Sequence, residues 1–152
     1  MNEEYKIYLD NFDRNEKIDI TRILEVEKEL KVKFPIDYVD FMQEFNGGEG
    51  FVVKEYLIMY KMHEIIEVND DCEVSEYVPG IILFGSNGGG EYFAFDYRGS
   101  EIKYIIIPSM LDYDDIIIQS TTLKEFFKRL YNGMIFENWL VNKGDKWKWK
   151  EY

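Results

Sequence analysis

The sequence predicts a single α+β domain over residues 1–152, with a central, largely antiparallel β-sheet flanked by helices. Two short apolar runs at 81–84 and 92–95 are joined by a glycine-rich segment at 85–90, a pattern that predicts a β-hairpin buried on both faces for much of its length. Glycine fits this reversal because tight turns need a positive φ, which is costly for residues with a Cβ. With 46% hydrophobic residues, the chain is long enough to bury one core without disulfides.

The first 50 residues show helical periodicity. Apolar residues spaced three and four apart predict a short amphipathic helix at 4–12, followed by a polar loop at 11–19. A second helix is expected to begin near Thr21 and to end before Pro35, because the residue preceding a proline is disfavoured in helical geometry. Pro35 fits the first turn of a third helix, which the Asn-Gly-Gly segment at 46–48 closes with a left-handed glycine cap.

The rest of the chain predicts strands separated by two helices. One helix, mostly polar, is expected at 62–77; the other begins at Thr122, which can form a capping box with Glu125. The alternating Trp and Lys residues of the tail predict an edge strand, whose tryptophans either cover the core, which we favour, or anchor an interface. Strands are predicted at 51–60, 81–84, 92–95, 102–107, 116–118 and 146–150.

Composition excludes several classes of function. The net charge of −12, from 18 basic and 30 acidic residues, argues against nucleic acid and anionic membranes as partners, because both require Lys and Arg. A single cysteine excludes an internal disulfide framework and a cysteine-based zinc site. The start lacks the pattern of a secretory signal, and no apolar run approaches the ~20 residues of a membrane span. We therefore expect a cytoplasmic protein.

Residues with chemical potential have simpler structural interpretations. His63 is the only histidine and has no Cys or Ser near it in the sequence, so we interpret it as an ordinary surface residue. Acids on both sides of Cys72 disfavour a reactive thiolate. The glycine run at 85–90 leads into a strand, whereas phosphate-binding loops lead into a helix. We expect no catalytic residue, no cofactor and no metal site, although a hydrolase with paired carboxylates remains an alternative.

Charge is distributed unevenly along the chain. Residues 62–97 contain eight acids and no Lys or Arg, whereas residues 124–152 contain seven bases and four acids. An acidic surface can occupy the basic cleft of a nuclease in place of phosphate; the other interpretation is that the acids only maintain solubility. We expect this surface to bind a basic protein partner through residues at 62–77 and 112–115. The candidate residues are Glu64, Glu67, Asp70, Asp71, Glu73, Glu76, Asp112, Asp114 and Asp115.

Several motifs follow one another between about residues 20 and 132. They are an apolar helix pattern from Ile23 to Leu30, Phe34-Pro35-x2-Tyr38-x2-Phe41, Asn46-Gly47-Gly48, an apolar strand and Gly-rich turn followed by an aromatic strand ending at Asp96, and a closing helix from Leu123 to Tyr131. This ordered set resembles the SUKH superfamily, the family of the fungal Smi/Knr cell-wall-assembly regulators and of many small bacterial proteins. Phe34 departs from the pattern, since the family usually has leucine before the proline.

The resemblance implies an α+β fold built on an antiparallel sheet. For bacterial single-domain members it also implies a non-enzymatic immunity protein that binds and neutralises a cognate toxin, often a nuclease or other enzyme. The alternative is a regulatory or scaffolding module like the fungal relatives. The family supplies no agreed catalytic residues, and its motif positions in this chain look like determinants of corners and core.

Overall fold

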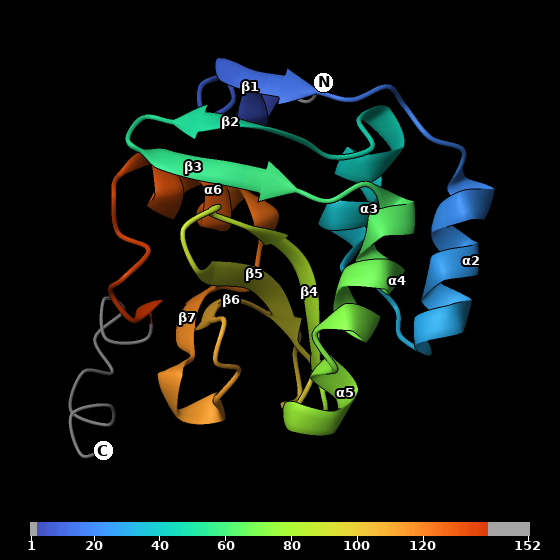
Figure 1. Cartoon of the computed structure of the whole chain (residues 1–152). Helices are drawn as coiled ribbons and strands as arrows, with labels where there is room; N and C mark the ends of the chain where they lie inside the picture. Colours follow the sequence, from blue (N-terminus) through green and yellow to red (C-terminus); the bar gives the residue numbers. More distant parts are fainter. Residues whose placement is uncertain (1–2, 140–152) are drawn as a thin grey trace.

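The computed structural model describes residues 3–139, which form one seven-stranded sheet with helices on both of its faces (Figure 1). The strands lie across the sheet in chain order and each neighbouring pair is antiparallel, which confirms the predicted α+β class. The strands are β1 (Asn11–Arg14), β2 (Gly48–Val52), β3 (Glu55–Met59), β4 (Ile81–Ser86), β5 (Glu91–Asp96), β6 (Lys103–Pro108) and β7 (Ile117–Ser120). The helices are α1 (Glu3–Lys6), α2 (Ile20–Leu30), α3 (Ile36–Glu44), α4 (Met62–Asp71), α5 (Val74–Tyr77), the 3-10 helix η1 (Tyr113–Asp115) and α6 (Leu123–Tyr131).

The β4–β5 hairpin is the centre of the sheet, and its prediction is confirmed. Phe84 and Phe93 point to one face and pack with α3 and α6 in the main core. Leu83 and Ala94 point to the other face and join a second apolar cluster with α5. Both faces are therefore buried, as the apolar runs indicated. The connecting segment places glycines in the left-handed region, with φ +74° at residue 88 and +109° at residue 90.

The helices occur where expected, with corrections at their ends. Asp19, not Thr21, is the N-cap of α2, since its Oδ1 accepts a hydrogen bond from the Thr21 amide at 3.0 Å. Pro35 is the N-cap of α3 and so precedes its first turn. The C-cap of α3 is Phe45 in extended geometry, so the predicted glycine cap is wrong. Gly47 instead has a φ of +76° and passes close to β3. A Cβ added at this position would clash with the main-chain oxygen of Met59 in that strand.

Three predicted elements are wrong in their extent. The helix predicted at 4–12 ends at Lys6, and part of the expected loop pairs with β2 as β1, with Phe12 buried. The extended segment predicted at 51–60 is two strands joined by a two-residue turn. The helix predicted at 62–77 breaks into α4 and α5, because Glu73 adopts a left-handed φ of 53°.

The end of the described chain confirms the predicted start of the last helix in part. Thr122 is the N-cap of α6 and accepts a hydrogen bond from the Glu125 amide at 3.2 Å, but the reciprocal bond from the Thr122 amide to the Glu125 side chain, which a capping box needs, is not formed. Gly133 follows the helix in left-handed geometry. The strand predicted at 146–150, with both of its tryptophans, lies outside the described residues. Among the helices of residues 3–139, none has the length and apolar character needed to cross a membrane.

Asp37 joins three elements on the main core side of the sheet. Its Oδ1 accepts a hydrogen bond from the Tyr104 hydroxyl of β6 at 2.6 Å, and its Oδ2 accepts one from the Leu123 amide at the start of α6 at 2.7 Å. Burial, followed by the nearby Asp37 carboxylate, raises the pKa of Tyr104 well above its ordinary value. The carboxylate therefore fixes α3 against β6 and α6, a role that the sequence pattern did not indicate.

Candidate partner-binding surface

The α4–α5 segment carries most of the predicted site, and buried anchors hold it at the edge of β4. Met62 and Ile65 lie in the main core, whereas Val74 of α5 lies in the second cluster. The amide of Met62 donates to the Asn46 side chain at 2.8 Å, which ties the start of α4 to the turn after α3. Because both ends are anchored, the backbone that carries the acidic side chains is fixed.

Asn69 holds the middle of this segment against the sheet. Strands β3 and β4 pair at Ile58–Ser86 and Met59–Gly85, and within residues 3–139 no further strand pairs with the rest of β4 on this side. The Asn69 side chain takes that place: its Oδ1 accepts from the Leu83 amide at 2.9 Å and its Nδ2 donates to the Leu83 carbonyl at 3.0 Å. Buried main-chain groups need such partners, so Asn69 fixes α4 to the sheet. Sequence reasoning missed this residue, because one polar residue in an acidic helix does not stand out.

The predicted acidic residues of α4 and α5 fall into two groups. The Glu64 carboxylate accepts a hydrogen bond from the Lys61 amide at 2.8 Å, and so closes the first turn of α4. The other five side chains are exposed and pair with no other residue of the described chain. They are Glu67, Asp70, Asp71, Glu73 and Glu76. We call these five, together with Asp114 and Asp115, the acidic surface.

Local energetics do not favour the acids at the end of α4. The last turn of this helix has no basic residue and ends in Asp70-Asp71, next to the negative end of the helix dipole. Glu67 lies one turn before Asp71, so the two carboxylates also repel each other. The last turns of α2 and α6 instead carry bases, Lys28 in α2 and Lys128 in α6. Asp70 and Asp71 therefore lower the stability of α4 instead of supporting it.

The second predicted acidic segment lies on the same side of the sheet. Leu111 and Ile118, which flank η1, share the second apolar cluster with Val74. The Tyr113 hydroxyl donates to the Pro79 carbonyl at 2.5 Å, and so joins η1 to the end of the α5 segment. Asp112 caps η1 by accepting from the Asp114 amide at 2.9 Å. Asp114 and Asp115 are exposed and unpaired within the described chain.

Two other acids of the 62–97 segment are engaged internally. Glu91 accepts a hydrogen bond from the Asn87 side chain at 2.7 Å. Asp96 binds the Arg98 guanidinium through two hydrogen bonds of 3.0 Å. Burial alone would raise the pKa of Asp96, but the hydrogen bonds from Arg98 outweigh it and hold that pKa below its ordinary value. These two acids are structural, so they do not belong to the acidic surface.

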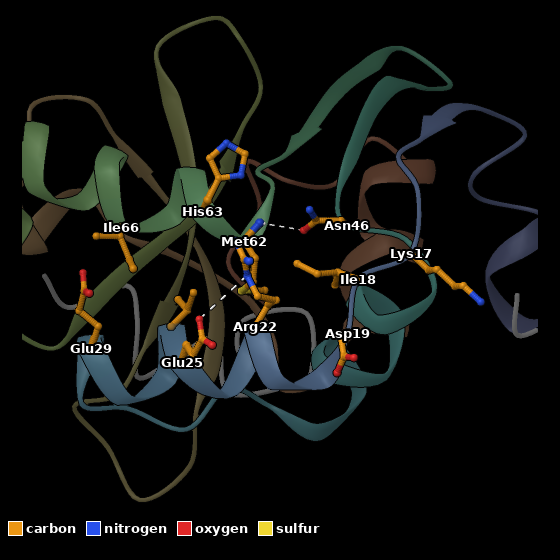
Figure 2. A pocket seen from close by; sticks show the side chains of 11 residues that line it. Lys17, Ile18, Asp19, Arg22, Glu25, Glu29, Asn46, Met62, His63 and Ile66 are labelled. Carbon is orange, nitrogen blue, oxygen red and sulfur yellow. Dashed lines mark hydrogen bonds and ion pairs between the residues drawn. The ribbon is translucent and has the colours of Figure 1, made fainter.

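A cavity of about 500 Å³ lies between α2 and the first turn of α4 (Figure 2). Its described lining mixes charges of both signs and includes no Ser, Thr or Cys. The Arg22 Nε lies 4.0 Å from the Glu25 Oε2, so this cation of the cavity lining already has an acidic partner. The mixed lining favours neither a cationic nor an anionic ligand. The lining consists of Lys17, Ile18, Asp19, Arg22, Glu25, Val26, Glu29, Asn46, Met62, His63 and Ile66.

His63 on α4 and Cys72, the C-cap residue of that helix, occupy ordinary positions. His63 is exposed at the rim of that cavity, and Figure 2 shows its ring directed away from the Arg22–Glu25 pair. The Cys72 sulfur lies 3.3 Å from the Tyr92 hydroxyl, and their hydrogen bond, with burial, raises the pKa of Tyr92 to about 12. Within residues 3–139, no three His, Cys, Asp or Glu side chains are grouped to hold a metal ion.

Comparison with known proteins identifies the family. The model of the SMI1 / KNR4 family (SUKH-1) matches residues 17–129, close to the 20–132 over which the motifs were found. Uncharacterized protein YnaB of Bacillus subtilis (strain 168) is 30% identical over 122 residues, which cover 79% of this chain and 81% of that protein. The match leaves out α1 and β1, which precede it in the chain. The resemblance is thus confirmed, and the chain belongs to the SMI1 / KNR4 family (SUKH-1).

Proposed function

We propose that this chain is a non-enzymatic immunity protein that binds a basic toxin domain and blocks it, for example by covering a nuclease cleft. The observation that carries the proposal is the acidic surface: seven exposed carboxylates without partners among residues 3–139, two of which lie at the end of α4 where they lower helix stability. Membership of the SUKH group supports a binding role, since the resemblance implies immunity for small bacterial members.

The electrostatics suit occlusion of a cationic cleft. A net charge of −12 attracts a basic domain from a distance, and such steering raises association rates by about 10- to 1000-fold at low salt. Carboxylates can occupy the positions that phosphate groups take in a nuclease cleft, because both present anionic oxygens to Lys and Arg. In this proposal the partner is a protein, and nucleic acid and membranes are excluded by charge repulsion.

The test is co-expression with a toxin encoded beside the gene of this chain. The unchanged chain should restore growth and bind the toxin domain, with affinity falling as salt rises. The triple variant Asp70→Asn/Asp71→Asn/Glu76→Gln should bind at least tenfold more weakly, a loss of about 1.4 kcal/mol. Its matched control, Asp10→Asn/Glu16→Gln/Glu101→Gln, changes the net charge equally at exposed positions elsewhere and should still protect.

Two outcomes contradict the proposal. Failure of the unchanged chain to protect against or bind the neighbouring toxin would reject the immunity role in favour of a regulatory module. Equal loss of binding in the triple variant and its control would show that net charge alone acts, and that the acidic surface is not the contact.

A further inference from the structure

The outer face of the β2–β3 hairpin is a second exposed surface, distinct from the acidic surface. The register pairs Glu49 with Ile58 and Phe51 with Tyr56, so these four side chains share one face. The alternate residues Val52, Leu57 and Met59 are buried in the main core on the opposite face. Phe51 is nevertheless 53% exposed, and Tyr56 and Ile58 are only partly buried. An aromatic face of this kind is typical of a contact surface.

Of the two aromatic side chains on this face, Tyr56 borders a cavity of about 550 Å³. Tyr56, Ile58 and Tyr60 of the β3 segment line it, and the first turn of α4 closes one end with Lys61 and Glu64. The Phe51 and Tyr56 rings contact each other edge to face, with centroids 4.9 Å apart. The glycine loop after β4 lies against the same rim, because a Cβ on Gly88 would come within 3.8 Å of the Tyr56 ring.

Carboxylates surround the aromatic rings. Tyr56 donates its hydroxyl hydrogen to Glu49 Oε2 at 2.5 Å, which fixes the Glu49 side chain and leaves its Oε1 without a hydrogen-bond donor in the described chain. Asp13 lies directly opposite Glu49 in the β1–β2 register, and both line the cavity. With Glu64 these make three carboxylates against one cation, Lys61, among the described residues that line the cavity.

We propose that this cavity binds an arginine side chain presented by a protein partner. A planar guanidinium can stack on the Tyr56 ring and donate paired hydrogen bonds to the Glu49 carboxylate, which a lysine ammonium cannot match in geometry. The excess of carboxylates supplies the charge complementarity and repels nucleic acid. The tyrosine hydroxyl orients Glu49 before binding, so little side-chain freedom is lost on contact.

This inference goes beyond the proposed function, because it needs none of the seven residues of the acidic surface and no toxin. Glu64, the first carboxylate of α4, lines this cavity and does not belong to the acidic surface. A partner could therefore use either surface without the other, and each is tested separately.

The experiment is an NMR titration of the full chain with the peptide acetyl-Gly-Arg-Gly-amide. Saturable shifts are expected at the amides around Glu49, Phe51 and Tyr56. The same peptide with citrulline, the neutral isostere of arginine, should give no saturable shift there. Glu49→Gln should raise the dissociation constant at least about fivefold, because hydrogen bonds that involve charged groups are the stronger ones.

The control variant is Glu55→Gln, which removes the same charge from β3 but at a position facing away from Glu49 and Tyr56. It should leave the dissociation constant unchanged, whereas Tyr56→Phe, which keeps the ring but frees Glu49, should weaken binding less than Glu49→Gln. Equal shifts with the citrulline peptide, shifts confined to the acidic surface, or equal effects of Glu49→Gln and Glu55→Gln would each overturn the proposal.

Discussion

Neutralising the end of α4 should stabilise the protein. In the double variant Asp70→Asn/Asp71→Asn, each carboxylate lost from the negative end of the helix dipole relieves about 0.3–1 kcal/mol. Loss of repulsion between Glu67 and Asp71 adds about 0.2–0.5 kcal/mol. Asn and Asp have similar helix propensities, so little is lost in exchange. We expect the free energy of unfolding to rise by about 1–2 kcal/mol at low salt, which corresponds to about 2–8 °C in Tm for a domain of this size.

Thermal unfolding followed by circular dichroism, at low and at high salt, measures this effect. The gain should shrink at 1 M salt, because exposed charges are screened. The control is Glu125→Gln, which removes a carboxylate from the first turn of α6, at the positive end of its dipole. That change should lower the unfolding free energy by about 0.3–1 kcal/mol.

The signs of the two effects decide between explanations. A rise in stability for both the Asp70/Asp71 variant and Glu125→Gln would attribute the gain to reduced net charge. A fall in stability for the Asp70/Asp71 variant would refute the reasoning, since it would mean that the acids hold internal contacts. A stabilised variant that also binds its partner more weakly would show that the acids serve binding at a cost to the fold.

Three further changes test the architecture. Val53→Gly should raise the free energy of unfolding, measured in urea, by roughly 0.5–1 kcal/mol. Val53 holds a φ of 60° that costs an L-residue about 1–2 kcal/mol, and the greater entropy of glycine in the unfolded chain offsets part of this gain. A loss of stability would contradict this. Asn69→Leu should lower it by about 2–6 kcal/mol, since the buried amide and carbonyl of Leu83 lose their partners; an unchanged midpoint would show that another group replaces the side chain. Because Arg98 lowers the folded-state pKa of Asp96, the stability that this pair contributes should be present above pH about 4 and be lost as the pH falls through the lowered pKa. Arg98→Met should weaken this dependence of the unfolding free energy on pH, measured by urea unfolding at about pH 2–6.

Where local chemistry decides the structure, the sequence predicted it. The hairpin at 81–96 follows from two runs of strand formers around glycines that adopt positive φ. The α6 helix follows from the Thr122 cap and apolar residues at helical spacing, of which Phe126 and Phe127 are fully buried. In these cases propensity, periodicity and tertiary packing all favour the same conformation, so single-sequence reasoning is sufficient.

Where tertiary contacts override local preference, the sequence failed. The β2–β3 turn consists of Val53 and Lys54, neither of which is a turn residue, so nothing marks a reversal. Likewise, Glu73 adopts a left-handed conformation without being Gly or Asn, and so divides the predicted helix at 62–77. Strand β1 carries only Phe12 as a buried residue and depends on pairing with β2. The residues that adopt these conformations therefore do not mark them in the sequence.

The candidate site was predictable in composition but not in detail. The run of acids in 62–77 is visible in the sequence, yet only the structure separates Glu64 and Asp112, which cap helices, from Asp70 and Asp71, which do not. Asp96 was counted with the acidic segment but binds Arg98. Hydrogen-bond partners depend on geometry at the level of ångströms, which a charge count does not contain.

The way α4 is attached bears on how its acids can act. Asn69 and the Met62 amide fix the helix to β4 and to the turn after α3, so Glu67, Asp70 and Asp71 project from a backbone that needs no ordering on contact. A partner then loses less of its binding energy to ordering this surface than it would to an acidic loop of the same charge. Solubility alone requires no such rigidity, because charges on mobile chains solubilise equally well. The combination of rigid attachment with locally unfavourable charge therefore favours a binding role for the acidic surface.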